Sequence, residues 1–188
     1  MIYGFVGSVF GSLRVPIRGN GKTISMTYWM NIERQDGREV FTNYHTTFST
    51  FIDTKEVAEL IFSGELGDII LGIDEIQKIL ENIGRNKYVE FMGDLVNESR
   101  KDDVDIFFTT QRFKNLVLRF REQVDRILVP KKYHVDTKDF CDIDKCKRIH
   151  FIMLYDYDPF EGLAYIGSID CVEVGKLYDT RQRIKREM

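Results

Sequence analysis

The chain has 188 residues, of which 43% are hydrophobic and 30% are charged. This balance is typical of a globular protein and excludes an intrinsically disordered one, and the length fits a single domain spanning residues 1–188. The formal net charge of −3 provides no global field that would attract nucleic acid. No apolar run reaches the roughly 18 residues that a membrane-spanning helix needs, so we expect no transmembrane segment.

The hydrophobic pattern predicts strands alternating with helices along most of the chain. The N-terminal residues 1–14 lack the features of a targeting peptide, and we expect a strand or a hairpin there. The expected core strands are 13–17, 39–45, 67–75, 103–111, 126–133, 148–158 and 163–174. The expected helices begin at Lys22 and Thr54 and then cover 76–83 and 88–101, with Asp53 or Thr54 as a helix cap.

The run at 67–75 is the most apolar in the chain, which is typical of a strand that is buried on both faces. Alternating strands and helices favour an α/β fold with a mostly parallel central sheet. We therefore expect helices on both sides of this sheet and additional strands at its C-terminal end.

The three cysteines, Cys141, Cys146 and Cys171, make an odd count, which fits a reducing compartment better than a disulfide framework. His134 and His150 flank the first two cysteines, and these residue types together can bind zinc. Because their spacing matches no standard zinc pattern, the sequence favours ordinary free thiols.

The segment PIRGNGKT, residues 16–23, contains the GKT core of a phosphate-binding loop. Glycines let backbone N–H groups curl around an anion, a lysine reaches the β- and γ-phosphates, and a hydroxyl holds Mg²⁺. Pro16 stands where the full motif has its first glycine, and a chance GKT at the start of a helix is the alternative. The expected nucleotide-binding residues are Pro16, Arg18, Gly19, Asn20, Gly21, Lys22 and Thr23.

Two acids, Asp74 and Glu75, end the most apolar strand. In P-loop enzymes the first such carboxylate holds Mg²⁺ together with the loop hydroxyl, here Thr23, and the second polarises the attacking water. The predicted strand at 103–111 ends in Gln111, whose amide can bond both the γ-phosphate and that water. A solvated strand end explains any one of these residues, but the order of the three motifs favours ATP hydrolysis.

These motifs resemble those of the FtsK/HerA superfamily of P-loop motors. The resemblance is strongest to its viral branch of genome-packaging ATPases and zonula-occludens-toxin-like (Zot-like) proteins. It covers about residues 13–180 and includes FTNYH, NESRKDDVDIFFTTQ, REQVDRILVP and LYDT. It implies a RecA-like ASCE P-loop NTPase fold, ATP and Mg²⁺ as ligands, and a homohexameric ring in which a neighbour's arginine completes each site. Arg100 is the first candidate for this arginine and Arg121 the second, although either can be an ordinary surface residue.

The resemblance further implies a translocase for double-stranded DNA that packages a viral genome through a capsid vertex or portal protein. Such a protein acts in the host cell cytoplasm, with association with the virion as a further option. Lys114, Lys131, Lys132 and the basic cluster 181–186 are candidate DNA contacts, with a solvated surface as the default. The alternatives are a Zot-like ATPase for virion morphogenesis or extrusion, ranked second because that class often has a transmembrane helix, a nucleotide-dependent switch, and a kinase.

Overall fold

The structure is a computed structural model that describes residues 1–9, 19–34, 37–63, 67–79, 85–101, 104–141, 143 and 146–178. Several sequence predictions fall outside these residues. They are the strand at 13–17, the loop residues Pro16 and Arg18, the helical positions Leu80 and Ile83, and the basic cluster 181–186.

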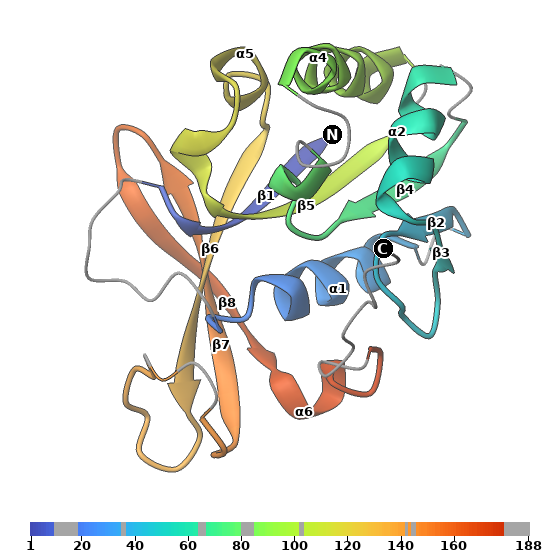
Figure 1. The fold of residues 1–188 in the computed structure, drawn as a ribbon. Helices are drawn as coiled ribbons and strands as arrows, with labels where there is room; N and C mark the ends of the chain where they lie inside the picture. Colours follow the sequence, from blue (N-terminus) through green and yellow to red (C-terminus); the bar gives the residue numbers. More distant parts are fainter. Residues whose placement is uncertain are drawn as a thin grey trace.

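One eight-stranded sheet organises the chain (Figure 1), with the order β3-β2-β4-β5-β1-β6-β7-β8. Its strands are β1 (Ile2–Ser8), β2 (Glu39–Thr42), β3 (Thr50–Phe51), β4 (Ile69–Ile73), β5 (Asp105–Arg112), β6 (Arg126–His134), β7 (His150–Asp158) and β8 (Gly162–Asp170). All neighbours from β3 to β6 are parallel, and β7 and β8 continue the sheet in antiparallel pairing. The predicted mostly parallel sheet with additional C-terminal strands is confirmed.

Helices cover both faces of the parallel part. The helical segments are α1 (Lys22–Glu33), α2 (Thr54–Ser63), α4 (Arg85–Lys101), η2 (Phe113–Asn115), α5 (Leu118–Arg121) and α6 (Cys171–Val174). Figure 1 shows α1 and α6 on one face of the sheet and α2, α4 and α5 on the other. None of the helices that the structure describes is long and apolar enough to cross a membrane.

Two hydrophobic cores follow from this layering. The larger lies under α2, α4 and α5 and includes Ile61, Phe91 and Phe108. The smaller lies under α1 and includes Met26 and Met30. Helix α1 packs very closely on β4, because a Cβ atom on Gly72 would come within 2.5 Å of the Met30 sulfur.

Strand β1 corrects the predicted start of the sheet. We expected the first core strand at 13–17, but residues 2–8 form a strand that is buried along its whole length and pairs with both β5 and β6. The apolar N-terminal segment is therefore the central strand that precedes the phosphate loop, in agreement with the expectation of a strand or hairpin there.

Side-chain caps set the ends of two elements. The Asp53 carboxylate accepts hydrogen bonds from the backbone amides of Lys55 and Glu56 at 2.7 and 2.8 Å, which confirms Asp53 as the cap of α2. The last predicted strand, 163–174, ends earlier than expected. Asp170 accepts a hydrogen bond from the Val172 amide at 2.7 Å, so residues 171–174 form the short helix α6 instead.

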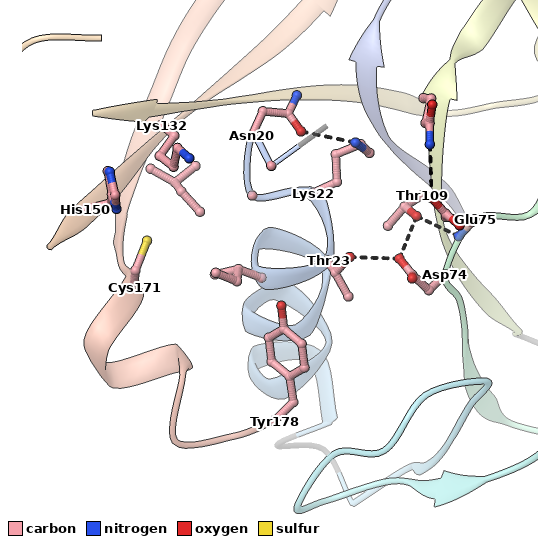
Figure 2. A pocket seen from close by; sticks show the side chains of 15 residues that line it. Asn20, Lys22, Thr23, Asp74, Glu75, Thr109, Lys132, His150, Cys171 and Tyr178 are labelled. Carbon is pink, nitrogen blue, oxygen red and sulfur yellow. Dashed lines mark hydrogen bonds between the residues drawn. The ribbon is translucent and has the colours of Figure 1, made fainter. Parts of the chain in front are cut away.

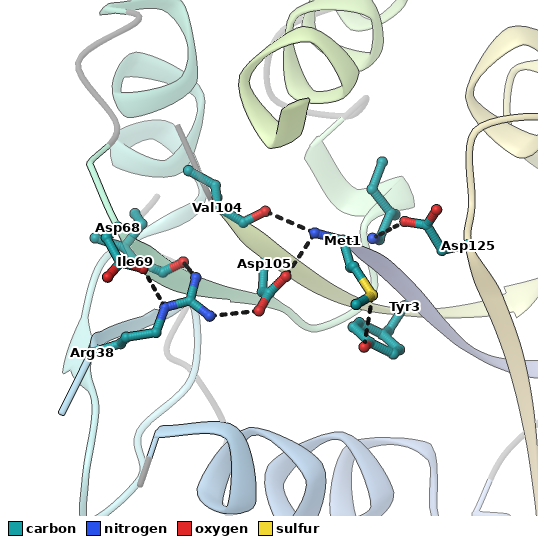
Figure 3. A network of polar contacts seen from close by, with 9 residues as sticks. Met1, Tyr3, Arg38, Asp68, Ile69, Val104, Asp105 and Asp125 are labelled. Atoms are coloured by element: carbon teal, nitrogen blue, oxygen red, sulfur yellow. Dashed lines mark hydrogen bonds and ion pairs between the residues drawn. The ribbon is translucent and has the colours of Figure 1, made fainter. Parts of the chain in front are cut away.

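Polar contacts tie the amino-terminal edge of the parallel strands together (Figure 3). The Arg38 guanidinium, beside β2, contacts Asp105 Oδ2 of β5 at 2.5 Å, Asp68 Oδ1 at 2.6 Å and the Ile69 carbonyl oxygen at 2.9 Å. Since β4 lies between β2 and β5, this one side chain links three strands. Arg38 and Asp105 are mostly buried, so water replaces these contacts poorly.

We predict that Arg38→Met lowers the free energy of unfolding by roughly 1–3 kcal/mol, because Asp105 loses its guanidinium partner in a poorly solvated position. Urea unfolding followed by circular dichroism measures the change. The matched control is Lys55→Met, since Lys55 and Glu59 form an exposed pair on α2 and should contribute less than about 0.5 kcal/mol. Equal effects of the two substitutions would contradict the proposed role of Arg38.

Candidate functional site

A cavity of about 330 Å³ lies at the carboxyl ends of the central strands, and Figure 2 shows its lining. Strands β1, β4 and β5 are parallel neighbours, so the residues that follow them meet at one edge of the sheet. The lining includes eight site residues that were predicted from the sequence: Gly19, Asn20, Gly21, Lys22, Thr23, Asp74, Glu75 and Gln111. The structure thus brings together three motifs that lie far apart in the sequence.

The described part of the phosphate loop has the backbone shape that glycine allows. Gly19 has φ 69° and Gly21 has φ 92°, both in the left-handed region. A Cβ atom on Gly21 would also lie 2.2 Å from Cδ1 of Ile152 on β7. Any other residue at this position would therefore have a strained backbone and would force the Ile152 side chain to move.

The start of α1 suits an anion. Among the described residues no side chain caps its N-terminus, and its first turn holds no acidic residue, so the positive end of the helix suits a phosphate. Lys22 is buried and its Nζ donates to Asn20 Oδ1 at 3.1 Å. Asn20 Nδ2 is buried without a hydrogen-bond partner among the described residues. An unsatisfied donor beside a buried lysine fits a bound phosphate.

Asp74 is the centre of the polar network. Its Oδ1 accepts hydrogen bonds from Thr23 Oγ1 and from Thr109 Oγ1, each at 2.8 Å. A carboxylate oxygen beside a threonine hydroxyl is the ligand set that Mg²⁺ prefers at a nucleotide. The residues present therefore fit the predicted Mg²⁺ site of Thr23 and Asp74.

Two residues that position Asp74 were not predicted as site residues. Asn43, just after β2, accepts from the Asp74 amide at 2.6 Å and donates to the Asp74 carbonyl oxygen at 3.0 Å. Thr109 joins Asp74 to β5. Asn43 lies in the quoted FTNYH segment and Thr109 two residues before Gln111, but an isolated Asn or Thr gives no signal of such a role.

Glu75 is held in an uncommon backbone conformation. Its φ is 52°, and for a residue other than glycine such a conformation costs of the order of 1–3 kcal/mol. The Glu75 amide donates to Thr109 Oγ1 at 2.7 Å, and its carbonyl oxygen accepts from the Lys78 amide at 2.8 Å. Gln111 Nε2 donates to Glu75 Oε1 at 3.1 Å. The turn therefore directs this carboxylate toward Gln111 at the cavity.

The charge state of Glu75 depends on its neighbours. Partial burial by itself would raise the pKa of Glu75, but the hydrogen bond and positive charge of Lys78 outweigh it, with smaller contributions from Gln111 and Lys22. The resulting pKa lies below the ordinary glutamate value. Glu75 is therefore ionised at neutral pH, as a group that accepts a proton from water must be.

The two candidate arginines lie outside the lining of this cavity. Arg100 is exposed near the end of α4, just before the amino end of β5, and donates to Gln123 Oε1. Arg121 ends α5, and its Nε is buried without a hydrogen-bond partner among the described residues. Neither position tests a role in a neighbouring subunit, so both assignments stay predictions.

The far wall of the cavity consists of residues that sequence reasoning did not assign to the site. Lys132, His150 and Cys171 lie across the phosphate loop from Asp74 and Glu75 (Figure 2). Burial, followed by the charge of Asp170, raises the pKa of Cys171 to about 11, which keeps this thiol protonated.

Three lysines were predicted as DNA contacts, and Lys132 lies in this cavity wall. Of the other two, Lys114 is exposed, and Lys131 Nζ lies 4.5 Å from the ring centre of Tyr155.

Comparison with known proteins identifies a shared fold. No protein-family model and no curated protein matches the sequence. Among solved structures, the crystal structure of the N-terminal domain of zonular occludens toxin from Neisseria meningitidis is similar, with a TM-score of 0.59 and 19% identity. The similarity covers 95% of this chain and 98% of that domain. With the strand order described above, it confirms the predicted RecA-like P-loop fold class.

We predict that Lys78→Met raises the pKa of Glu75, because partial burial then acts without its main opposing charge. Titration of the side-chain carboxyl carbons by NMR measures this pKa directly and requires no enzyme activity. The same shift means that Glu75 contributes stability above its unfolded-state pKa, and that this contribution disappears as the pH falls through the lower folded-state value. Lys55→Met is the control and should leave the Glu75 pKa unchanged; an unchanged pKa in Lys78→Met would contradict the assignment.

Proposed function

We propose that this protein is a Mg²⁺-dependent ATPase that hydrolyses the γ-phosphate of ATP. The observation that carries this proposal is the pair Asp74–Glu75, whose two carboxylates have different partners. Asp74 contacts the hydroxyls of Thr23 and Thr109, and Glu75 contacts Gln111 and Lys78. One acid is thus arranged for a metal and the other for water, as hydrolysis requires.

Each residue has a role in this proposal. Lys22 and the first amides of α1 bind the phosphates, and Thr23 and Asp74 hold Mg²⁺, which supplies neutralisation of phosphate charge. Glu75 accepts the proton of the attacking water. Gln111, hydrogen-bonded to Glu75 Oε1, orients that carboxylate and senses the γ-phosphate.

We predict that Glu75→Gln lowers kcat by at least about 10²-fold, because general-base contributions are typically of that size, while nucleotide affinity stays close to that of the wild type. Phosphate release measures turnover, and titration with a fluorescent ATP analogue measures binding. Glu59→Gln, an exposed acid on α2, is the matched control and should keep full turnover. An equal loss of binding and turnover in Glu75→Gln would rule out the assigned role of Glu75.

The biological setting has two candidates. The similarity to the zonular occludens toxin domain spans nearly all of both chains, and this favours the Zot-like ATPase of virion morphogenesis or extrusion. A packaging translocase for double-stranded DNA, working as a homohexamer at a capsid vertex, is the second candidate. The packaging translocase rests on the motif resemblance and on the arginine candidates Arg100 and Arg121. This ranking of the two candidates is the reverse of the one that the sequence favoured.

Steady-state ATP hydrolysis with and without linear double-stranded DNA separates the two candidates. For the morphogenesis ATPase we expect the rate to be the same in both conditions, because DNA is not its substrate. Light scattering after size exclusion identifies the protein concentrations at which a ring is present, and the comparison is made there. A several-fold rise with DNA that Arg100→Ala or Arg121→Ala abolishes would instead favour the packaging translocase. Absence of turnover with tight ATP binding would favour a nucleotide-dependent switch.

A further inference from the structure

Four potential metal ligands meet at the far end of the β6–β7 hairpin, which projects away from the helices in Figure 1. They are two histidines and two cysteines: His134, Cys141, Cys146 and His150. Each offers one ligand atom, a ring nitrogen or a sulfur, and these atoms all lie within 4.8 Å of one another. The sequence favoured free thiols here, because the linear spacing matches no common zinc motif.

The backbone brings these residues together. His134 ends β6 and His150 begins β7, and the antiparallel register places them directly opposite each other. Their rings are 5.0 Å apart between centroids. The chain then folds back along β6, because the amide of Cys141 donates to the Lys132 carbonyl oxygen at 2.8 Å and the amide of His134 donates to the Asp139 carbonyl oxygen at 3.0 Å. These bonds set Cys141 beside the two histidines.

The polar atoms of the cluster lack adequate partners. His150 Nε2 is buried and has no hydrogen-bond partner among the residues that the structure describes, and His134 Nε2 has the Cys146 sulfur 3.4 Å away. Within the described part of the chain, the buried Cys141 has a long sulfur contact of 3.9 Å to the Ile143 carbonyl oxygen. Buried polar atoms in native proteins almost always have a partner, which is a protein group, an ordered water or an ion. A metal ion would use the ligating capacity that these four side chains leave unused.

We propose that His134, Cys141, Cys146 and His150 bind one Zn²⁺ ion in a structural site. Two thiolates and two imidazoles are a ligand set that zinc prefers, and four protein ligands leave no open position for catalysis. In tetrahedral zinc sites the ligand atoms lie roughly 3.3–3.8 Å apart, given zinc–ligand distances of about 2.0–2.3 Å. The Cys146 sulfur and His134 Nε2 are already 3.4 Å apart. The remaining separations, at most 4.8 Å, need to close by about 1 Å.

The position of the site suggests what it stabilises. Lys132 Nζ donates to the carbonyl oxygen of Ile143, between the two cysteines, at 2.8 Å. Both Lys132 and His150 line the cavity at the phosphate loop, and Ile152, two residues after His150, packs against Gly21. Zinc at the end of the hairpin would therefore fix the wall of the cavity.

The chain contains three cysteines and three histidines, so the cluster leaves one of each as a matched control. We predict that protein purified without an affinity tag from zinc-supplemented cells contains one zinc per chain by plasma mass spectrometry. Cys146→Ser and His150→Gln should lose most of this zinc, whereas Cys171→Ser and His45→Gln should retain it. Zinc well below one per chain in the wild type, or equal zinc in all four variants, would overturn the proposal.

Cobalt substitution tests the ligands in the wild-type protein. Its result therefore does not depend on whether the Cys146 and His150 variants fold. Protein refolded with Co²⁺ should show thiolate-to-cobalt charge-transfer absorption and the intense visible bands of a tetrahedral site. Absence of the charge-transfer absorption would overturn the proposal. Neither measurement involves ATP, so failure of the proposed ATPase function would leave both readouts interpretable.

Discussion

The candidate site depends on one carboxylate. Asp74 Oδ1 accepts hydrogen bonds from Thr23 on α1 and Thr109 on β5, while Asn43 after β2 holds the Asp74 backbone from the other side. A residue at the end of β4 thus fixes the first turn of the loop helix and the neighbouring strands. Because these bonds are short and partly buried, a displacement of α1 would be transmitted to the strand that carries Gln111.

The site keeps locally unfavourable features in place by packing around them. Glu75 has a left-handed backbone, and Gly21 faces Ile152 so closely that a Cβ atom there would force the Ile152 side chain to move. Thr109 stabilises the Glu75 conformation, since its hydroxyl accepts a hydrogen bond from the Glu75 amide and donates one to Asp74 Oδ1. Strain of this kind persists where the surrounding structure over-determines it, and it is common at functional sites.

Local sequence signals predicted most of this architecture and only part of the site. The continuous apolar run before Asp74 predicted a buried strand, and parallel strands necessarily bring Glu75 and Gln111 to one edge. Asn43 and Thr109 could not be assigned, because their contacts depend on strand register between segments some thirty residues apart. The strand predicted at 163–174 was too long. The apolar pattern continues through residue 174, but the Asp170 side chain caps a short helix that begins at Cys171, so the strand ends at Asp170.

The same limit explains the cysteine–histidine cluster. The common zinc patterns consist of closely spaced ligand pairs, whereas here the register of two antiparallel strands brings His134 opposite His150, sixteen residues later in the sequence. That register also pairs Lys132 with Ile152, the residue that contacts Gly21. A slip of one residue would turn Ile152 to the opposite face and separate the histidines. A metal that holds the two histidines together would therefore also hold Ile152 against the phosphate loop. Loss of the metal at the hairpin end would then loosen the packing at the nucleotide site.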